Sequence, residues 1–391
     1  MKKRQNLIIL AAATTLILAG CGKTETTETT EVTKVPVKEG SAALLTSLDQ
    51  LKGQLDSSKV KDPKKQSTLL ENQWASFEDE VKPKFPELYF KVEKFLTPLE
   101  AGLKQDKLDY ATLTALNNNL KAAITELSTS LADNKGAVNK DVITASKELQ
   151  EAAKAYNKYV QEQGKQLVAG LEQLDAAVKS GDLKKAQDSY GQSRMPYERI
   201  EPIIETFSEL DGVMDARVDD FNNEKDPEFT GYHRIEYLLF VKKNVKEAEA
   251  FSSRLLEDGK KMQQAIAATT IEPSDFIAGV GELMEEAQAT KITGEEERWS
   301  GATIPVIRAN VEGAQAIYDL VKGELKKKDA ALDEKISKSL TTVIETMNSL
   351  SPVGVTWNDF SKIEQAKQID LKNKLEALAE PLVKMPGTLS K

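Results

Sequence analysis

One imidazole is the centre of any chemistry in this sequence. His233 is the only histidine among 391 residues, and Glu236 follows it three positions later. On a helix, side chains at positions i and i+3 lie on one face, so both can reach the same ion. Imidazole with carboxylate suits iron, zinc, copper or manganese. The H-x-x-E pattern therefore predicts a metal site, although a helix histidine that only hydrogen bonds to a neighbour also explains the tetrapeptide.

The segment around this motif must be helical for the two side chains to converge. Pro227 and Gly231 precede an unbroken run rich in apolar residues, and Thr230 can cap its start. The sequence therefore predicts a helix that presents His233 and Glu236 together.

Two acidic runs flank this helix in the sequence. The first, Glu198, Glu201 and Glu205, has spacings of three and four, which predicts a single helix face. Like charges so placed repel by roughly 0.2 to 0.5 kcal/mol per adjacent pair. A bound cation or a nearby Arg would relieve this repulsion. The second run, 295–297, follows Gly294, and a helix that begins there would stabilise its acids through the helix dipole.

The elements that must position these residues are predicted to be helices throughout. Leu, Ala, Lys and Glu abound, and apolar residues recur at spacings of three and four. The expected fold class is all-α, with a small N-terminal helical domain at 41–132 and a larger helical-bundle domain at 142–391. Helices of the small domain are expected at 41–57, 66–82, 86–104 and 109–131. In the larger domain they are expected at 141–180, 245–269 and 272–290, among others.

Aromatic residues are expected to fill the core of the small domain, namely Trp74, Phe77, Tyr89, Phe90 and Phe95. The acids between them are expected to lie on a solvated face, namely Glu78, Glu80 and Glu87. In the larger domain, Asp215 and Arg217 are expected to form structural charge pairs.

The N-terminus has the features of an exported lipoprotein. Residues 1–20 combine a basic start with a short apolar stretch, which is typical of a signal peptide. Leu18-Ala-Gly-Cys21 resembles a bacterial lipobox, so Cys21 is the expected lipidation site. Residues 21–40 are rich in Thr and Glu and are expected to form a flexible tether. The protein is therefore expected on the extracytoplasmic face of a cell membrane, at the cell surface or in a periplasm.

Composition narrows the remaining function classes. The net charge of −9 attracts cations and disfavours nucleic acid as a partner. A Cys-based zinc site is excluded because Cys21 is the only cysteine. The helical zinc-peptidase motif H-E-x-x-H needs two histidines, and serine hydrolysis would need a G-x-S-x-G elbow that the sequence lacks.

Five sequence blocks then occur in a fixed order. They are Tyr190…Arg194…Tyr197-Glu-Arg-Ile-Glu-Pro202, Leu210-Asp-Gly…Asp215-Ala-Arg217, Phe229-Thr-Gly-Tyr-His-Arg-Ile-Glu236, Lys291-Ile-Thr-Gly-Glu-Glu-Glu-Arg298 and Ala309-Asn-Val-Glu-Gly313. In these blocks the chain, from about residue 142 to its end, resembles the EfeO/EfeM iron-uptake proteins of the imelysin-like, nominal peptidase family.

This resemblance implies a helical-bundle domain that binds iron, Fe²⁺ or Fe³⁺, outside the cytoplasmic membrane, with zinc or copper able to bind in vitro. It also implies two partners, an EfeU-type iron permease and an EfeB-type haem peroxidase. The family's H-x-x-E motif corresponds to His233 and Glu236, and its acidic block corresponds to Glu198 and Glu201. Glu295 and Glu296 are further candidate ligands. Arg194 or Arg234 is expected to orient the carboxylates.

One departure from the family concerns copper. Many members carry an N-terminal cupredoxin domain, whose copper site needs two His and a Cys. Residues 41–132 cannot build such a site, because His233 is already used and Cys21 is expected to be acylated. We therefore expect a lipid-anchored, non-enzymatic iron-binding component that delivers iron to a permease. The alternatives are a zinc-dependent peptidase-like protein and a structural surface lipoprotein without a metal site.

Overall fold

Helices are the regular elements of this computed structural model, which describes residues 33–289, 291–351 and 357–391. No strand occurs in these ranges, which confirms the predicted all-α fold class. Residues Lys34–Lys391 form one compact unit. The predicted signal peptide 1–20, the lipidation site Cys21 and the tether up to residue 32 lie outside the described residues.

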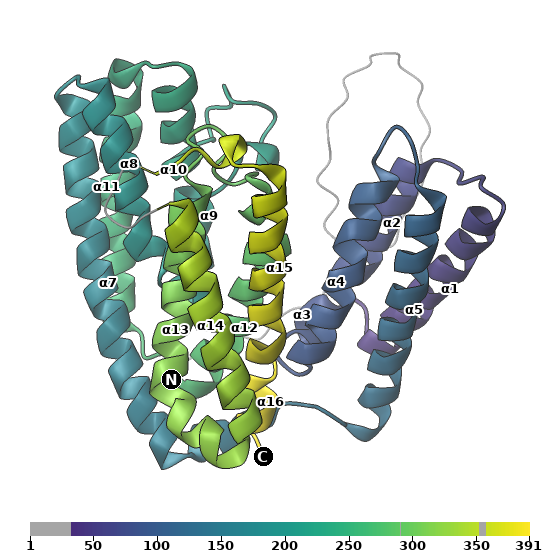
Figure 1. The fold of residues 1–391 in the computed structure, drawn as a ribbon. Helices are drawn as coiled ribbons and strands as arrows, with labels where there is room; N and C mark the ends of the chain where they lie inside the picture. Colours follow the sequence, from purple (N-terminus) through teal and green to yellow (C-terminus); the bar gives the residue numbers. More distant parts are fainter. Residues whose placement is uncertain (1–32, 290, 352–356) are drawn as a thin grey trace, which may run out of the picture. The chain divides into compact units, whose positions relative to one another are not determined.

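Five helices form the first part of the fold, and they are α1 Val37–Asp56, α2 Pro63–Ala75, α3 Glu78–Val81, α4 Pro86–Leu103 and α5 Tyr110–Asp133. Helix α5 packs against α1 and α4, and α2 packs against α4 (Figure 1). Trp74 and Phe77 are buried in the core of these helices, as predicted. Phe90 is buried too, but it belongs to the hydrophobic cluster of the helices that follow.

Three details of this first part differ from the prediction. Helix α1 already begins at Val37, within the range predicted as tether. The helix predicted at 66–82 is divided into α2 and α3. Glu80 and Glu87 are exposed, as predicted, but Glu78 is half-buried, and burial together with the carboxylate of Glu93 raises its pKa to about 7.

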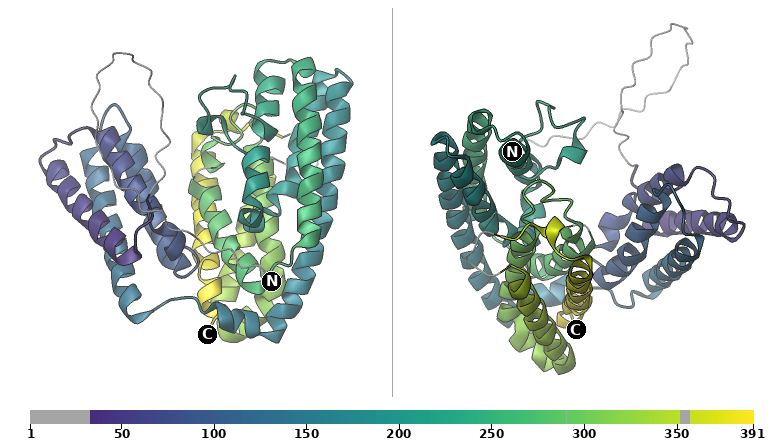
Figure 2. Two further views of the ribbon diagram at one scale, coloured as in Figure 1. Left: turned by 180° about the vertical axis from the view of Figure 1, so that it is seen from behind. Right: turned by 45° about the horizontal axis from the view of Figure 1, so that its top comes forward.

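The remaining helices enclose a second, larger hydrophobic core. They are α6 Lys140–Ala145, α7 Lys147–Lys179, α8 Leu183–Glu198, α9 Ser208–Met214, α10 Gly231–Glu236, α11 Val245–Ala268, α12 Pro273–Ala289, α13 Thr303–Lys328, α14 Ala330–Leu350, α15 Gln365–Leu382 and α16 Met385–Leu389. Short 3-10 helices lie at Glu201–Phe207 (η1), Val218–Asp220 (η2), Lys291–Thr293 (η4) and Phe360–Lys362 (η5), and a π-helical turn (η3) follows α10 at Tyr237–Val241. Helix α7 packs along both α8 and α11, and the views of Figures 1 and 2 show α7 and α11 running side by side.

Caps explain where the long helices of this part begin. Ser146, Asp182 and Asn244 each accept a hydrogen bond from a backbone N–H in the first turn of α7, α8 and α11. Ser146 also divides the helix that was predicted to run unbroken over 141–180, since its extended backbone separates α6 from α7.

The two acidic runs do not form the predicted helix faces. Helix α8 ends at Glu198 and the tighter η1 begins at Glu201, because Pro202 has no N–H to give to the carbonyl of Glu198. That carbonyl accepts a hydrogen bond from Asn310 Nδ2 instead, at 3.0 Å. Residues 294–300 form turns, and α13 begins only at Thr303, which places Pro305 in its first turn, where proline is tolerated. The helix face predicted for the first run was therefore wrong, and the helix considered for the second run does not begin at Gly294.

None of the helices in the described ranges is both long and apolar enough to cross a bilayer.

Candidate metal centre

Helix α10 carries His233 and is docked directly onto the end of α9. Gly231, its first residue, has a φ of +76°, and a Cβ there would lie 2.3 Å from the carbonyl oxygen of Met214. Thr230 was predicted to cap this helix with its side chain, and it does not. Its hydroxyl donates a hydrogen bond to the carbonyl of Val213 at 3.2 Å instead. This close approach sets His233 opposite Asp215, the residue that follows α9.

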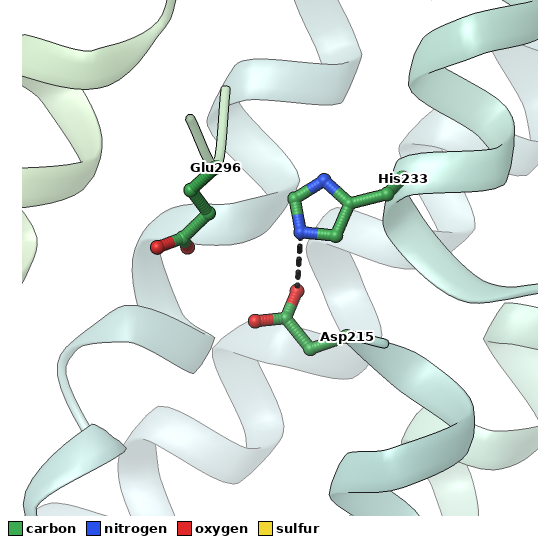
Figure 3. A group of neighbouring side chains, drawn as sticks. All are labelled: Asp215, His233 and Glu296. Carbon is green, nitrogen blue, oxygen red and sulfur yellow. Dashed lines mark ion pairs between the residues drawn. The ribbon is translucent and has the colours of Figure 1, made fainter. Parts of the chain in front are cut away.

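Asp215, His233 and Glu296 form a group that could hold a metal ion (Figure 3). One ligand atom from each lies within 4.8 Å of the others. His233 Nε2 is 3.5 Å from an oxygen of Asp215. The His233 and Glu296 side chains are buried and that of Asp215 is 13% exposed. Three residues far apart in the sequence thus converge on one small volume.

Glu236 fixes the orientation of the imidazole. One of its carboxylate oxygens lies 3.3 Å from His233 Nδ1, and the other accepts hydrogen bonds from the backbone N–H groups of Trp299 and Ser300 at 3.0 and 2.7 Å. A carboxylate acceptor at Nδ1 favours the tautomer with the proton there, which leaves the Nε2 lone pair free. Nε2 is buried and makes no hydrogen bond to any residue that the structure describes.

The charges around His233 favour its protonation when no metal is bound. Burial alone would lower the pKa of His233, but the hydrogen bond to Glu236 and the charge of Asp215 outweigh it. The pKa is therefore raised above its usual value of 6.5.

Two buried cations lie beside this group. Arg194 is fully buried, and its guanidinium lies over the ring of Tyr232, 4.8 Å from the centroid. Its ion-pair partners are Glu198, Asp215, Glu296 and Glu297. Lys291 Nζ lies between Glu198 and Glu201, at 3.2 Å from each, and 3.3 Å from Glu296.

Carboxylates outnumber the cations in this buried network. Arg194 and Lys291 face five of them, Glu198, Glu201, Asp215, Glu296 and Glu297, and Glu236 faces His233. Burial raises the pKa of Glu297 to about 8, although Arg194 opposes this shift. A cation bound here would take the place of the protons that these buried acidic groups and His233 hold without it.

The structure brings most of the predicted site residues into this network, with different neighbours. Glu198 contacts Arg194, Lys291 and Asn310 Nδ2, the last at 2.9 Å. Glu295 is exposed. Arg234 lies over the rings of Phe229 and Phe251 and 3.7 Å from Glu247, and these contacts hold it apart from the group of Figure 3.

Sequence reasoning had assigned Asp215 to a structural charge pair. It does pair with Arg194, but it also faces His233. Lys291 and Glu297 were part of a quoted sequence block, but neither was predicted to be a site residue. The sequence did contain a signal for Asp215. It lies in the block Leu210-Asp-Gly…Asp215-Ala-Arg217, one of the five blocks on which the family resemblance rests.

Comparisons with known proteins agree on one family. The model of the imelysin family, designated peptidase M75, matches residues 152–385. Iron uptake system component EfeM of Bacillus subtilis (strain 168) is 31% identical over an alignment of 391 residues, covering 98% of this chain and 99% of that protein.

EfeO proteins align with a shorter part of the chain, at higher sequence identity. Iron uptake system component EfeO of Yersinia pseudotuberculosis is 39% identical over 235 residues, and that of Escherichia coli O1:K1 is 37% identical over 239 residues. The alignments cover 60% and 61% of this chain and 63% and 64% of those proteins, so the chain spans less than two thirds of the EfeO proteins. A crystal structure of an iron-regulated protein A precursor from Parabacteroides distasonis covers 63% of this chain and 95% of its own, at 13% identity and a TM-score of 0.47.

Proposed function

The chain belongs to the imelysin family, and on this premise we propose that it is the iron-binding component of an iron uptake system, as its relatives are named. Iron is its cargo, taken up outside the cytoplasmic membrane and passed to an EfeU-type permease, with an EfeB-type haem peroxidase as the third component. Acylation of Cys21 would anchor the protein to the membrane. The predicted division into domains at 41–132 and 142–391 is part of the same proposal, with the metal centre in the second domain.

The observation that carries the proposal is the convergence of the buried His233 Nε2, which makes no hydrogen bond within the described residues, with the carboxylates of Asp215 and Glu296. Without metal, the protonated Nε2 faces Asp215, and a metal ion would take the place of that proton. The ligands are then His233 Nε2, Asp215 and Glu296, and one nitrogen with several oxygens suits iron. Glu236 acts as a positioning residue that holds the proton at Nδ1.

Iron binding requires an exchange of partners within the network. Glu296 and Asp215 must turn from Arg194 toward the ion, and Lys291 must release Glu296. Neither cation is then left unpaired, because Arg194 keeps Glu198 and Glu297 while Lys291 keeps Glu198 and Glu201. The network can thus accept a cation without stranding a buried charge. The peptidase alternative is not favoured, because the relatives of this chain are named as components of iron uptake systems.

Anaerobic calorimetric titration with Fe²⁺, Zn²⁺ and Cu²⁺ tests the proposal. The protein is the chain from Gly22 onward, which contains the whole compact unit Lys34–Lys391. Saturable iron binding by the wild type should be lost in His233→Ala and weakened at least about tenfold in Asp215→Asn. Glu257→Gln, at an exposed carboxylate on α11, is the matched control and should bind like the wild type. If His233→Ala binds iron as well as the wild type, the metal centre is wrong and a structural role replaces it.

The same titration assigns the role of Glu236. Loss of a residue that only orients a ligand typically weakens binding 10- to 100-fold. Glu236→Gln should therefore retain saturable but weaker iron binding. Complete loss, equal to that of His233→Ala, would make Glu236 a ligand instead of a positioning residue.

A further inference from the structure

Lys291 is a buried cation that lies beside the candidate metal centre without belonging to it. It is the first residue of η4, which packs against α12 and α13. Its side chain is only 1% exposed, and its Nζ lies 3.2 Å from Glu198, 3.2 Å from Glu201 and 3.3 Å from Glu296. Burial of an ammonium is costly unless opposite charges surround it, and here three carboxylates do. One of them, Glu296, is also a proposed iron ligand.

The three contacts of Lys291 are not equivalent. Its Nζ donates hydrogen bonds to Glu198 Oε2 and Glu201 Oε1. Glu296 Oε2 is within ion-pair distance, but it is buried and receives no hydrogen bond from the residues that the structure describes. The other oxygen of Glu296 accepts a hydrogen bond from Arg194 at 2.7 Å. Lys291 is therefore held in place by Glu198 and Glu201, and its attraction to Glu296 is the contact most easily given up.

A metal ion and this ammonium compete for the same carboxylate. Glu296 converges with His233 and Asp215 on one small volume (Figure 3). An ion that binds there must first overcome the attraction between Glu296 and Lys291. Afterwards Lys291 stays with Glu198 and Glu201, so its positive charge remains close to the bound ion. Like charges repel strongly where water is scarce, so Lys291 opposes metal binding in both respects.

The backbone keeps the competitor near the ligand. Lys291 and Glu296 lie five residues apart on one segment, joined by a turn at Gly294, whose φ is +80°. The Gly294 N–H donates a hydrogen bond to the carbonyl of Lys291 at 3.0 Å, which closes this turn. The ammonium therefore cannot move far from Glu296 without a change in the turn itself.

We propose that Lys291 is a built-in competing cation, which lowers the metal affinity of the centre at His233 so that bound iron can be released. This inference rests on the proposed function, because a component that passes iron to a permease must let it go. Lys291 acts through Glu296 and is not itself a ligand. Its removal should tighten metal binding, whereas removal of a lysine that only supports the fold should weaken it.

Calorimetric titration of Lys291→Met with Zn²⁺ tests the inference, using the chain from Gly22 onward. Zn²⁺ is the probe because imidazole with carboxylates binds it and it does not change oxidation state. Lys291→Met should bind Zn²⁺ at least about tenfold more tightly than the wild type. It should also release the ion to a chelator more slowly by about the same factor. Lys260→Met, at an exposed lysine on α11, is the matched control and should bind like the wild type. Equal or weaker binding by Lys291→Met would overturn the inference.

A second comparison shows whether Lys291 competes for Glu296 or only adds positive charge nearby. In Glu296→Gln the side chain is neutral, so Lys291 has no carboxylate to compete for at this position. Addition of Lys291→Met to Glu296→Gln should therefore change the Kd for Zn²⁺ less than about threefold. The same tightening in both backgrounds would contradict competition for Glu296.

Another variant guards against loss of the fold. Removal of Lys291 takes from Glu201 the ammonium with which it pairs, and an unpaired buried carboxylate destabilises a fold. Glu201→Gln/Lys291→Met also removes that negative charge. It should bind Zn²⁺ at least about tenfold more tightly than Glu201→Gln alone. Urea denaturation checks that each variant is folded, and equal affinities in this pair would again overturn the inference.

His233→Ala separates this inference from the proposed function. Zn²⁺ binding that is lost in His233→Ala but is no tighter in Lys291→Met would overturn the role of Lys291 and leave the metal centre intact. Zn²⁺ binding that is equal in the wild type and His233→Ala would overturn the metal centre, and the inference with it. No binding by either the wild type or Lys291→Met would also overturn both.

Discussion

At the scale of single residues, the two nitrogens of His233 have different tasks. Nδ1 faces Glu236, which is itself held by two backbone N–H groups, so a turn of the ring would break its contact with a fixed carboxylate. Nε2 faces Asp215 and Glu296. Such a carboxylate behind a ligating imidazole makes the ring a better ligand, because it stabilises the positive charge that metal binding develops there.

The raised pKa of His233 predicts a pH-dependent affinity. Below this pKa the ring is protonated at Nε2 as well, and a metal must displace that proton. Affinity should therefore fall as the pH falls through the raised pKa, by about tenfold per pH unit once the protonated form dominates. Titration of the wild type with Mn²⁺ between pH 5.5 and 8, beside His233→Ala, measures this dependence. A constant Kd over this range would show that His233 is not a ligand.

How much of the site could be predicted depended on sequence distance. His233 and Glu236 share one helical turn, so their spacing already placed them together. Asp215 and Glu296 reach the same place only because α10 docks onto α9 and the 294–300 turns fold back over it. Periodicity contains no information on such contacts. The sequence therefore located the imidazole, and tertiary packing selected its neighbours.

At the scale of elements, the site depends on the short helix α10 and the π-helical turn that follows it. Six residues cannot form a stable helix in isolation, so tertiary contacts must hold α10 in place. Its buried face and the close contact of Gly231 with the end of α9 provide them. The position of His233 is thus determined by one glycine.

Gly231→Ala should unfold this arrangement. A Cβ at φ +76° would be strained and would also collide with the Met214 carbonyl. We expect the free energy of unfolding to fall by about 2 to 4 kcal/mol, with weaker metal binding. Urea denaturation measures this effect. Gly212→Ala on α9 is the control, since its Cβ would meet no described atom within 4 Å. A similar loss in both variants would contradict the special role of Gly231.

The same scale shows why helix prediction succeeded in the long elements and failed at the acidic runs. Helices such as α11 and α12 bury one regular face, so the apolar spacing identified them. At Glu201 the missing N–H of Pro202 and the competing hydrogen bond from Asn310 end the helix early. At Gly294, positive φ values there and at Gly301 favour turns. Of these causes, only the missing N–H of Pro202 could be predicted from the sequence alone.

At the scale of the whole molecule, the buried carboxylates that a metal site needs lower the stability of the metal-free fold. The chain carries a formal net charge of −9, and part of this excess is placed in the interior around Arg194 and Lys291. Buried like charges destabilise a fold unless a cation compensates them. The metal-free protein is therefore expected to be less stable than the metal-bound protein.

Glu296→Gln tests how one of these buried charges affects stability without and with metal. Without metal, removal of one buried negative charge should raise the free energy of unfolding by about 0.5 to 2 kcal/mol, because Arg194 and Lys291 retain other partners. With metal, the wild type should gain about 2.7 kcal/mol at a concentration 100 times Kd, and the variant much less. Urea denaturation with a chelator and with Mn²⁺, beside Glu257→Gln, measures both. If the metal-free variant is instead less stable than the wild type, Glu296 serves as a counter-charge for the buried cations, and the network is structural.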